Sequence, residues 1–202
     1  MLNIFARASV SRVTDPIGAW LLRRGLTPNT VTVIGTAGVV ASALWFFPRG
    51  QLFAGAAAVT VFVLFDLIDG AMARARGSGT KYGAVLDATC DRIADGALFA
   101  ALTWWAFASG NRWLAAAGFI CLVSAQVISY VKARAEANGL SADGGLAERA
   151  ERFIIALVGA GVQGLGVPHL LDVALWLLAV LAVATVLQRL LAVQRAAKEA
   201  GE

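Results

Sequence analysis

Residues 51–74 read QLFAGAAAVTVFVLFDLIDGAMAR, a long apolar run that ends with two aspartates, Asp66 and Asp69. About 20 predominantly apolar residues are enough for a helix to cross a bilayer, so this stretch predicts a transmembrane helix. A second apolar stretch, residues 83–107, carries three more aspartates: Asp87, Asp91 and Asp95. An ionised aspartate within a span costs about 2.5–3.5 kcal/mol, and a marginally stable protein needs compensation for several of them. These carboxylates therefore mark the functional part of the chain.

The composition of the whole chain supports a membrane location. Of its 202 residues, 59% are hydrophobic and 15% are charged, and the mean hydropathy is +0.73. Soluble domains are about 45–50% apolar and about 25% charged. The composition therefore excludes a disordered chain, a fibrous protein and an ordinary water-soluble enzyme. The two cysteines, Cys90 and Cys121, lack metal-ligand spacing and are interpreted as packing residues.

Six apolar stretches predict an all-α, polytopic membrane protein with six transmembrane helices. They cover residues 30–47, 51–74, 83–107, 113–134, 150–166 and 171–192. Residues 1–25 place apolar and basic side chains on opposite faces of a helix, as in amphipathic helices that lie on an anionic membrane surface. A cytosolic tail is the alternative. We expect a juxtamembrane helix over residues 1–25 and a six-helix transmembrane domain over residues 26–202.

Basic residues indicate the orientation of the chain. On one side of the predicted membrane, only Arg49 and Arg112 lie in loops, whereas most other Lys and Arg residues lie in the amino-terminal segment or towards the opposite side. Short loops rich in Lys and Arg remain in the cytosol. We therefore expect a multi-pass protein of the plasma membrane with both termini and the loops 75–82 and 138–148 in the cytosol.

The spacing of four aspartates predicts a metal site. Asp66 and Asp69 are three residues apart, and Asp87 and Asp91 are four apart, so each pair shares one face of its helix. The two spans are antiparallel, and counting from the loop between them places the two pairs at similar depth. Four converging carboxylates would form an all-oxygen site for two Mg²⁺ ions.

Three other interpretations of the aspartates remain open. They could form salt bridges within the membrane, with Arg92 as the nearest partner, line an ion or proton path, or cap helix ends. Asp95 repeats the four-residue step one turn deeper, and we expect it to support the site rather than to bind metal.

A phosphate site is expected beside the carboxylates. Gly70 and Ala73 leave room for a group to approach the helix backbone, and Arg74 supplies a positive charge. Thr80, in a glycine-rich loop, adds a hydroxyl and neighbouring backbone donors. This combination is suited to a pyrophosphate, although small residues also mediate helix packing in membranes.

The combined pattern resembles the signature of the CDP-alcohol phosphotransferase family. It reads Asp66-x-x-Asp69-Gly70-x-x-Ala73-Arg74, eight further residues, and Gly83-x-x-x-Asp87-x-x-x-Asp91. The resemblance implies a six-span catalytic fold, usually a homodimer. It also implies transfer of a substituted phosphate from a CDP-linked donor to an alcohol, with release of CMP.

The resemblance also implies roles for individual residues. Asp66 and Asp87 would bridge two Mg²⁺ ions, with Mn²⁺ as a possible substitute, while Asp69 and Asp91 would each complete one ion. Asp91 would also act as the base that deprotonates the acceptor hydroxyl. The CDP moiety of the donor would contact Asn29, Thr30, Val31, Thr32, Gly70, Ala73, Arg74 and Thr80.

Basic residues in the second half of the chain indicate what kind of acceptor the protein binds. Lys132, Arg152 and Arg189 lie at similar predicted depth on three helices and would form a socket for an acceptor phosphate. The alternative is that they serve membrane topology alone. Nearly the whole chain is similar to the actinobacterial phosphatidylinositol phosphate synthases, which join CDP-diacylglycerol to inositol 1-phosphate. Those enzymes tend to carry proline where this chain has Ala150.

Other functions are compatible with parts of the pattern. Glycerol 3-phosphate as acceptor would make the protein a phosphatidylglycerol phosphate synthase, because that acceptor also carries a phosphate. An ion-coupled transporter would place its acids near the midplane on broken helices, whereas here they lie towards one face and residues 66–74 contain no proline. A membrane assembly factor without catalysis would leave the charge pattern unexplained.

Overall fold

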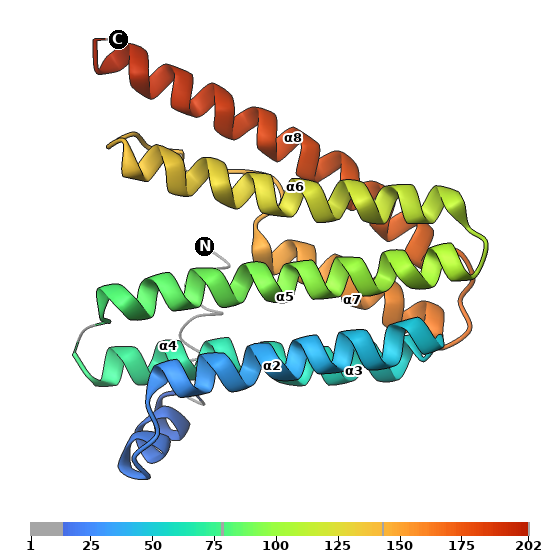
Figure 1. Ribbon diagram of the computed structural model, residues 1–202, viewed down its shortest axis with the longest axis horizontal. Coiled ribbons are helices and arrows are strands. Elements are labelled where there is room, and N and C mark those ends of the chain that lie inside the picture. Colours follow the sequence, from blue (N-terminus) through green and yellow to red (C-terminus); the bar gives the residue numbers. More distant parts are fainter. Residues whose placement is uncertain (1–13, 78, 143, 202) are drawn as a thin grey trace. The chain divides into compact units, whose positions relative to one another are not determined.

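The computed structural model describes residues 14–77, 79–142 and 144–201, and within these ranges the chain contains helices and no strand (Figure 1). A helix covers residues 14–23. The elements that follow are α2 (Pro28–Phe46), the 3₁₀ helix η1 (Phe47–Arg49), α3 (Leu52–Val63), α4 (Phe65–Ala75), α5 (Lys81–Ala108), α6 (Arg112–Ala137), α7 (Arg149–Gly164) and α8 (Leu170–Glu199). The predicted all-α class is confirmed.

Local sequence explains where two of these helices begin. The backbone N–H of Thr30 donates to Oγ1 of Thr27 at 3.2 Å, so Thr27 caps α2 and Pro28 occupies its first position. Asn111 caps α6 in the same way, because its Oδ1 accepts a hydrogen bond of 3.0 Å from the N–H of Leu114. Both helices thus start where a capping side chain precedes an apolar run.

The stretch predicted as one helix over residues 51–74 is divided at Leu64 into α3 and α4. The N–H of Leu67 bonds the carbonyl of Leu64, three residues back, at 3.2 Å. The rings of Phe62 and Phe65 flank the break, with centroids 5.7 Å apart. A Cβ at Gly35 of α2 would lie 2.8 Å from Cβ of Phe65, so the bulky residues at the break fill space that a glycine leaves.

Four helical stretches of the described chain are long and apolar enough to cross a membrane: Pro28–Arg49, Leu52–Ala75, Arg112–Ala137 and Leu170–Glu199. The protein is therefore a membrane protein. The helices α5 and α7 occupy the remaining two predicted positions, but α5 carries several charged residues and α7 has only 16 residues. The helix over residues 14–23 falls within the predicted juxtamembrane segment, whose residues 1–13 lie outside the described part.

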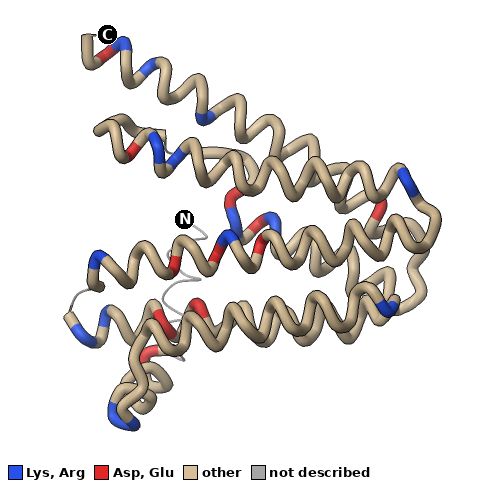
Figure 2. The backbone as a smooth tube through the Cα atoms, viewed as in Figure 1, with Lys and Arg blue, Asp and Glu red and all other residues tan. Residues whose placement is uncertain are grey.

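The chain divides into two compact units. The first comprises the described residues of Met1–Ala41 together with Ala58–Ala94, and the second comprises Ser42–Ala57 and the described residues of Asp95–Glu202. All motif aspartates belong to the first unit, whereas the basic residues predicted for the acceptor belong to the second. Figure 2 shows acidic positions within α4 and the first half of α5, and basic positions towards the ends of α6 and α8.

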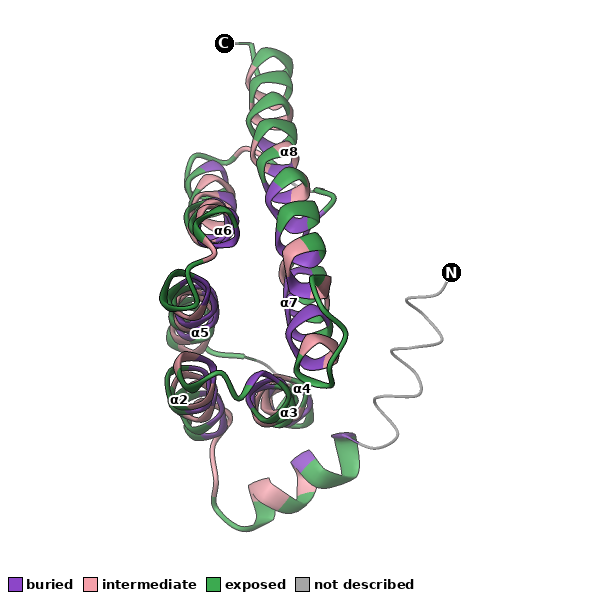
Figure 3. Cartoon of the chain, turned by 90° about the vertical axis from the view of Figure 1, so that its right-hand side faces the viewer, coloured by how far each residue is buried: buried purple, intermediate pink, exposed green. Residues whose placement is uncertain are grey.

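In the second unit, α8 packs against α6 and α7. Its contact face is formed by small and branched apolar residues, and Figure 3 shows this buried face beside an exposed one. The buried residues of α8 include Leu171, Ala174, Leu175, Leu178, Ala179 and Ala182.

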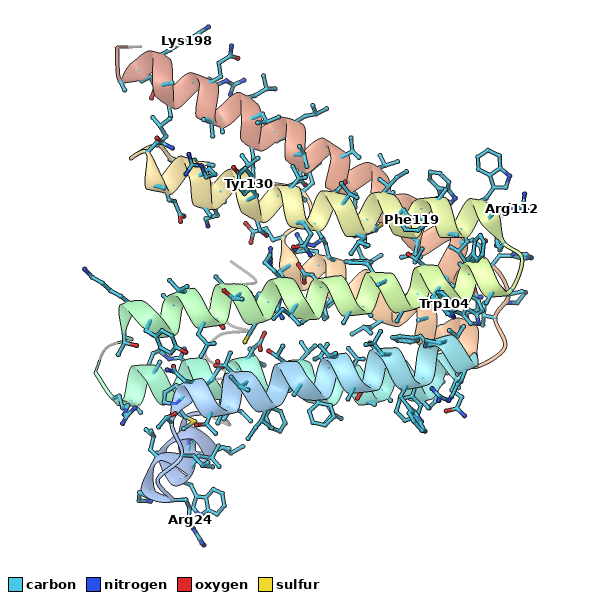
Figure 4. The ribbon with its side chains drawn as sticks, viewed as in Figure 1. Arg24, Trp104, Arg112, Phe119, Tyr130 and Lys198 are labelled. Carbon is cyan, nitrogen blue, oxygen red and sulfur yellow. The ribbon has the colours of Figure 1, made fainter. Side chains whose placement is uncertain are left out.

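Large apolar side chains also point away from the helices. Trp104, Phe119 and Tyr130 are labelled in Figure 4, and 65%, 57% and 65% of their surfaces are exposed. Soluble monomers rarely expose so many large apolar residues, whereas a lipid bilayer covers them. The exposed apolar faces therefore agree with a membrane location.

Candidate functional site

The four motif aspartates lie on two helices of the first unit. Asp66 and Asp69 belong to α4, and Asp87 and Asp91 to α5. Asp69 is buried, Asp66 and Asp91 are partly buried, and Asp87 is exposed. The charges of Asp66 and Asp87 both act on the Asp69 carboxylate. The Asp69 carboxylate is therefore influenced by one carboxylate of its own helix and by one of α5.

Asp69 is held by a residue from a third helix. Oγ1 of Thr32 in α2 donates a hydrogen bond to Oδ2 of Asp69 at 2.5 Å, and both residues are buried. A hydrogen bond to a buried carboxylate relieves part of its desolvation and fixes its orientation. Thr32 therefore links the start of α2 to the aspartate motif.

The aspartates provide the ligand chemistry of a hard divalent cation. They are all oxygen donors, and Mg²⁺ and Mn²⁺ prefer carboxylates completed by water and substrate phosphates. Among the described residues, no group of three or more His, Cys, Asp or Glu side chains is arranged to hold a metal ion by itself. The residues fit a metal that shares its ligands with a phosphate substrate, rather than one enclosed by protein.

The residues that follow Asp69 have two different environments. Ala71 and Met72 are buried, and a Cβ at Gly18 would lie 3.1 Å from the backbone nitrogen of Met72. The helix over residues 14–23 therefore packs closely on this side of α4. Gly70 and Ala73 remain partly exposed, and Arg74 is exposed, with its Nη2 3.4 Å from Oδ1 of Asp15.

Asn29 and Thr80, both predicted to contact the donor, lie together. The N–H of Gly83 donates to Oγ1 of Thr80 at 2.9 Å. A Cβ at Gly83 would lie 3.1 Å from both Oδ1 of Asn29 and Oγ1 of Thr80, so the starts of α2 and α5 approach each other closely at this glycine. Thr30 is exposed near them, whereas Val31 is buried and packs in the core.

Arg152 is buried in the second unit within a polar network. Its Nη2 lies 2.9 Å from Oδ2 of Asp95, and its Nη1 donates to the carbonyl of Ala147 at 2.9 Å. Only 1% of its surface is exposed. Within the described chain, the buried Nε of Arg152 has no hydrogen-bond partner. A buried guanidinium with an unsatisfied donor is costly unless an anion or water completes it.

Arg189 contacts α6, and Lys132 belongs to it. Arg189 is buried and donates from Nη1 to the carbonyl of Ile128 at 2.8 Å and from Nε to the carbonyl of Gly144 at 3.1 Å. Lys132 lies one turn after Ile128, is partly exposed, and its Nζ is 3.9 Å from Oε1 of Glu136. The three predicted basic residues therefore belong to α6, α7 and α8 of the second unit.

Asp95, which we expect to support the site rather than to bind metal, has two basic partners. It is fully buried in the second unit and pairs with two arginines of α7, with Oδ1 3.5 Å from Nε of Arg149. This pairing is not among the interactions predicted from the sequence. The available signal was charge complementarity, because Asp95 lies deep in an apolar stretch and Arg149 and Arg152, three residues apart, share a helix face. Such a buried acid needs a basic partner.

The comparisons with known proteins match nearly the whole chain. The family model described as CDP-alcohol phosphatidyltransferase matches residues 25–188. A phosphatidylinositol phosphate synthase of Mycobacteroides abscessus is 56% identical over 196 residues, covering 96% of this chain and 89% of that protein. A protein of the same name from Mycobacterium tuberculosis is 58% identical over 193 residues, covering 94% of this chain and 89% of its own length.

Solved structures agree with these matches. The crystal structure of the Mycobacterium tuberculosis phosphatidylinositol phosphate synthase with CDP-DAG bound has a TM-score of 0.87 and 60% identity, covering 90% of this chain and 94% of that one. The same enzyme in complex with manganese and citrate has a TM-score of 0.86 and 58% identity, covering 90% of this chain and 89% of that one. Fold, motif and overall similarity lead to one conclusion: this chain belongs to the CDP-alcohol phosphatidyltransferase family.

Proposed function

We propose that this protein is a phosphatidylinositol phosphate synthase, which transfers the phosphatidyl group of CDP-diacylglycerol to a hydroxyl of inositol 1-phosphate and releases CMP. The choice of a phosphorylated acceptor rests on one observation above all. Arg152 is buried, and its Nε has no hydrogen-bond partner among the described residues. Asp95 already pairs with Nη2 of this guanidinium, and a phosphate would supply an anionic acceptor for its Nε, which an uncharged alcohol does not.

The donor is assigned to the first unit. Arg74 and Thr80 contact its pyrophosphate and cytidine. Asn29 lies beside Thr80 and closes over the same part of the donor. Asp66, Asp69, Asp87 and Asp91 would hold two divalent cations, Mg²⁺ or Mn²⁺. When bound, these cations neutralise charge on the attacking and leaving oxygens. The relative in complex with manganese supports this assignment.

Asp91 is assigned as the general base. It is partly buried in the first half of α5, and its Oδ2 lies 3.9 Å from Nη2 of Arg92. The carboxylate takes the proton of the acceptor hydroxyl as that oxygen bonds to the lipid-linked phosphorus. The bond between this phosphorus and the bridging pyrophosphate oxygen breaks, and CMP leaves with the electron pair.

The acceptor phosphate is assigned to the second unit. Arg189 is held by its bonds to Ile128 and Gly144, and its planar guanidinium with five N–H groups is suited to bind a phosphate. Lys132 adds a mobile charge one turn along α6. Together with Arg152, these residues provide two fixed guanidinium groups and one ammonium for a dianionic phosphate.

The membrane arrangement follows from the same proposal. We assign all six helical stretches to the membrane, including α5 and α7, whose charged residues serve the reaction. The active site faces the cytosol at the plasma membrane, where its water-soluble acceptor is found. A homodimer is the expected assembly of the family.

The proposed function is tested with purified protein in detergent, CDP-diacylglycerol, Mg²⁺ and labelled inositol 1-phosphate. We expect labelled lipid and CMP in equal amounts, loss of both on chelation, and recovery with Mg²⁺ or Mn²⁺. Release of CMP with glycerol 3-phosphate but not with inositol 1-phosphate would leave the transferase assignment standing and make glycerol 3-phosphate the acceptor. Absence of CMP release with every alcohol tested would refute the transferase assignment.

A further inference from the structure

Thr185 of α8 holds the loop that leads into α7. Its side chain is fully buried, and its Oγ1 accepts hydrogen bonds from the N–H groups of Leu146 at 3.1 Å and Ala147 at 3.0 Å. The same hydroxyl donates to the carbonyl of Leu181 in its own helix at 2.8 Å. One side chain therefore satisfies two backbone donors nearly 40 residues away in sequence.

The loop fits closely against Thr185. Gly145 has a φ of 143°, and a Cβ at this position would lie 2.5 Å from Cγ2 of Thr185. A side chain here would push the loop away from α8. The absence of a Cβ at Gly145 and the two hydrogen bonds at Leu146 and Ala147 thus fix the same short segment, Gly144–Ala147.

The carbonyl groups of this segment hold the two buried arginines. The carbonyl of Ala147 accepts from Nη1 of Arg152 at 2.9 Å, and that of Gly144 accepts from Nε of Arg189 at 3.1 Å. Each guanidinium has a second anchor elsewhere, at Asp95 for Arg152 and at Ile128 for Arg189. Because a guanidinium is planar, two anchors set the direction of its remaining N–H groups.

We propose that Thr185 is a positioning residue for the acceptor phosphate, acting through the segment Gly144–Ala147 on Arg152 and Arg189. This inference rests on the proposed function and adds to it the residue that orients the acceptor site. Thr185 itself has no role in contacting the acceptor, because its hydroxyl is already occupied by Leu146, Ala147 and Leu181. Its effect is transmitted by backbone position alone.

The test compares isosteric variants of two buried threonines in the same unit. Thr185→Val removes the acceptor of two backbone N–H groups. Thr103→Val is the matched control, because Oγ1 of Thr103 is bonded only to the carbonyl of Phe99 in its own helix, at 2.6 Å, among the bonds of the described chain. Thr185→Ser restores the hydroxyl without the methyl group. Binding of inositol 1-phosphate by calorimetry and steady-state kinetics with both substrates are measured for each.

We expect Thr185→Val to weaken inositol 1-phosphate binding and to raise its KM about tenfold, because two buried donors lose their partner and the loop shifts. The KM for CDP-diacylglycerol should stay within about twofold, since the donor is assigned to other residues. Thr185→Ser should recover most of the affinity, and Thr103→Val should resemble the wild type.

The test separates failure of the positioning role from failure of the proposed function. If the wild type binds inositol 1-phosphate and Thr185→Val binds it equally well, the positioning role is wrong and the proposed function stands. Equal losses for both substrates, or equal losses in Thr103→Val, would likewise indicate general destabilisation and overturn the positioning role. If the wild type binds glycerol 3-phosphate instead, the acceptor assignment fails, and the same comparison with that ligand decides the role of Thr185. Binding of neither ligand would overturn both.

Discussion

Oγ1 of Thr32 donates a 2.5 Å hydrogen bond to Oδ2 of Asp69, joining the start of α2 to the buried aspartate of α4. Thr32 was expected to contact the donor, and the structure shows it holding a proposed metal ligand. Partners of metal ligands orient them, and their loss typically lowers metal affinity about 10–100-fold. The two ends of the segment Asn29–Thr32 thus have different neighbours. Asn29 lies beside Thr80, and Thr32 holds the carboxylate of Asp69.

Replacing Thr32 tests this support. Thr32→Val should raise the Mg²⁺ concentration needed for half-maximal CMP release by about tenfold, because the Asp69 carboxylate loses its fixed orientation. Thr89→Val is the control, since its Oγ1 donates a hydrogen bond to the carbonyl of Val85 in its own helix. An unchanged Mg²⁺ requirement in Thr32→Val would show that the hydrogen bond does not serve the metal.

Replacing Asp91 tests the proposed base. Asp91→Asn should lower kcat by about 10²–10⁴-fold, the usual contribution of a general base. Asp172→Asn is the control, because Asp172 lies at the start of α8 and its Oδ1 accepts a hydrogen bond of 2.6 Å from Nδ2 of Asn111, which is not a proposed substrate residue. Product formation by Asp91→Asn at the wild-type rate would exclude Asp91 as the base and as an essential ligand.

Replacing Asp95 tests the buried ion pairs of the second unit. Asp95→Asn leaves Arg149 and Arg152 without their counter-charge, and we expect a loss of about 3 kcal/mol in the free energy of unfolding. Glu136→Gln, which affects an exposed pair with Lys132, should cost less than about 1 kcal/mol. Denaturation in mixed micelles measures both. Equal losses of unfolding free energy in the two variants would show that the buried ion pairs of Asp95 stabilise the protein no more than an exposed pair does.

Replacing Gly164 tests the close packing of the second unit. A Cβ at Gly164 would overlap the backbone nitrogen of Phe53 and would lie 3.0 Å from its Cα. Gly164→Ala should therefore destabilise the protein by about 1–3 kcal/mol, because backbone atoms must move. Gly96→Ala is the matched control, since its nearest atom, Nε2 of Gln126, would be 3.7 Å away. A normal melting temperature for Gly164→Ala would contradict the packing described.

Hydrophobic stretches located the helices α2 to α8, with α3 and α4 in one stretch, because burial in lipid or in a core demands long apolar runs. They were poorer guides to where helices end. The helix α8 continues to Glu199, beyond the predicted residue 192, and α6 continues to Ala137, beyond residue 134. Alanine, lysine, arginine and glutamate at these ends are strong helix formers but are not apolar as a group, so a hydropathy pattern misses them.

Contacts between distant residues were the part that sequence could not predict. The break at Leu64 carries no proline or glycine signal, and it lies where Phe65 packs on Gly35 of another helix. The bond between Asp95 and Arg152 joins residues 57 apart, and the bond from Ala147 to Thr185 joins residues 38 apart. Helical spacing defines which residues share a face, whereas the partner of that face depends on tertiary packing.

The central claim is that a phosphorylated inositol is the acceptor, and direct competition tests it best. Purified protein in detergent receives CDP-diacylglycerol and Mg²⁺ with equal concentrations of inositol 1-phosphate and glycerol 3-phosphate, each carrying a different label. We predict that nearly all lipid product carries the inositol label, and that Arg152→Gln loses this product. Preferential labelling by glycerol 3-phosphate, or product from unphosphorylated inositol at the same rate, would contradict the account.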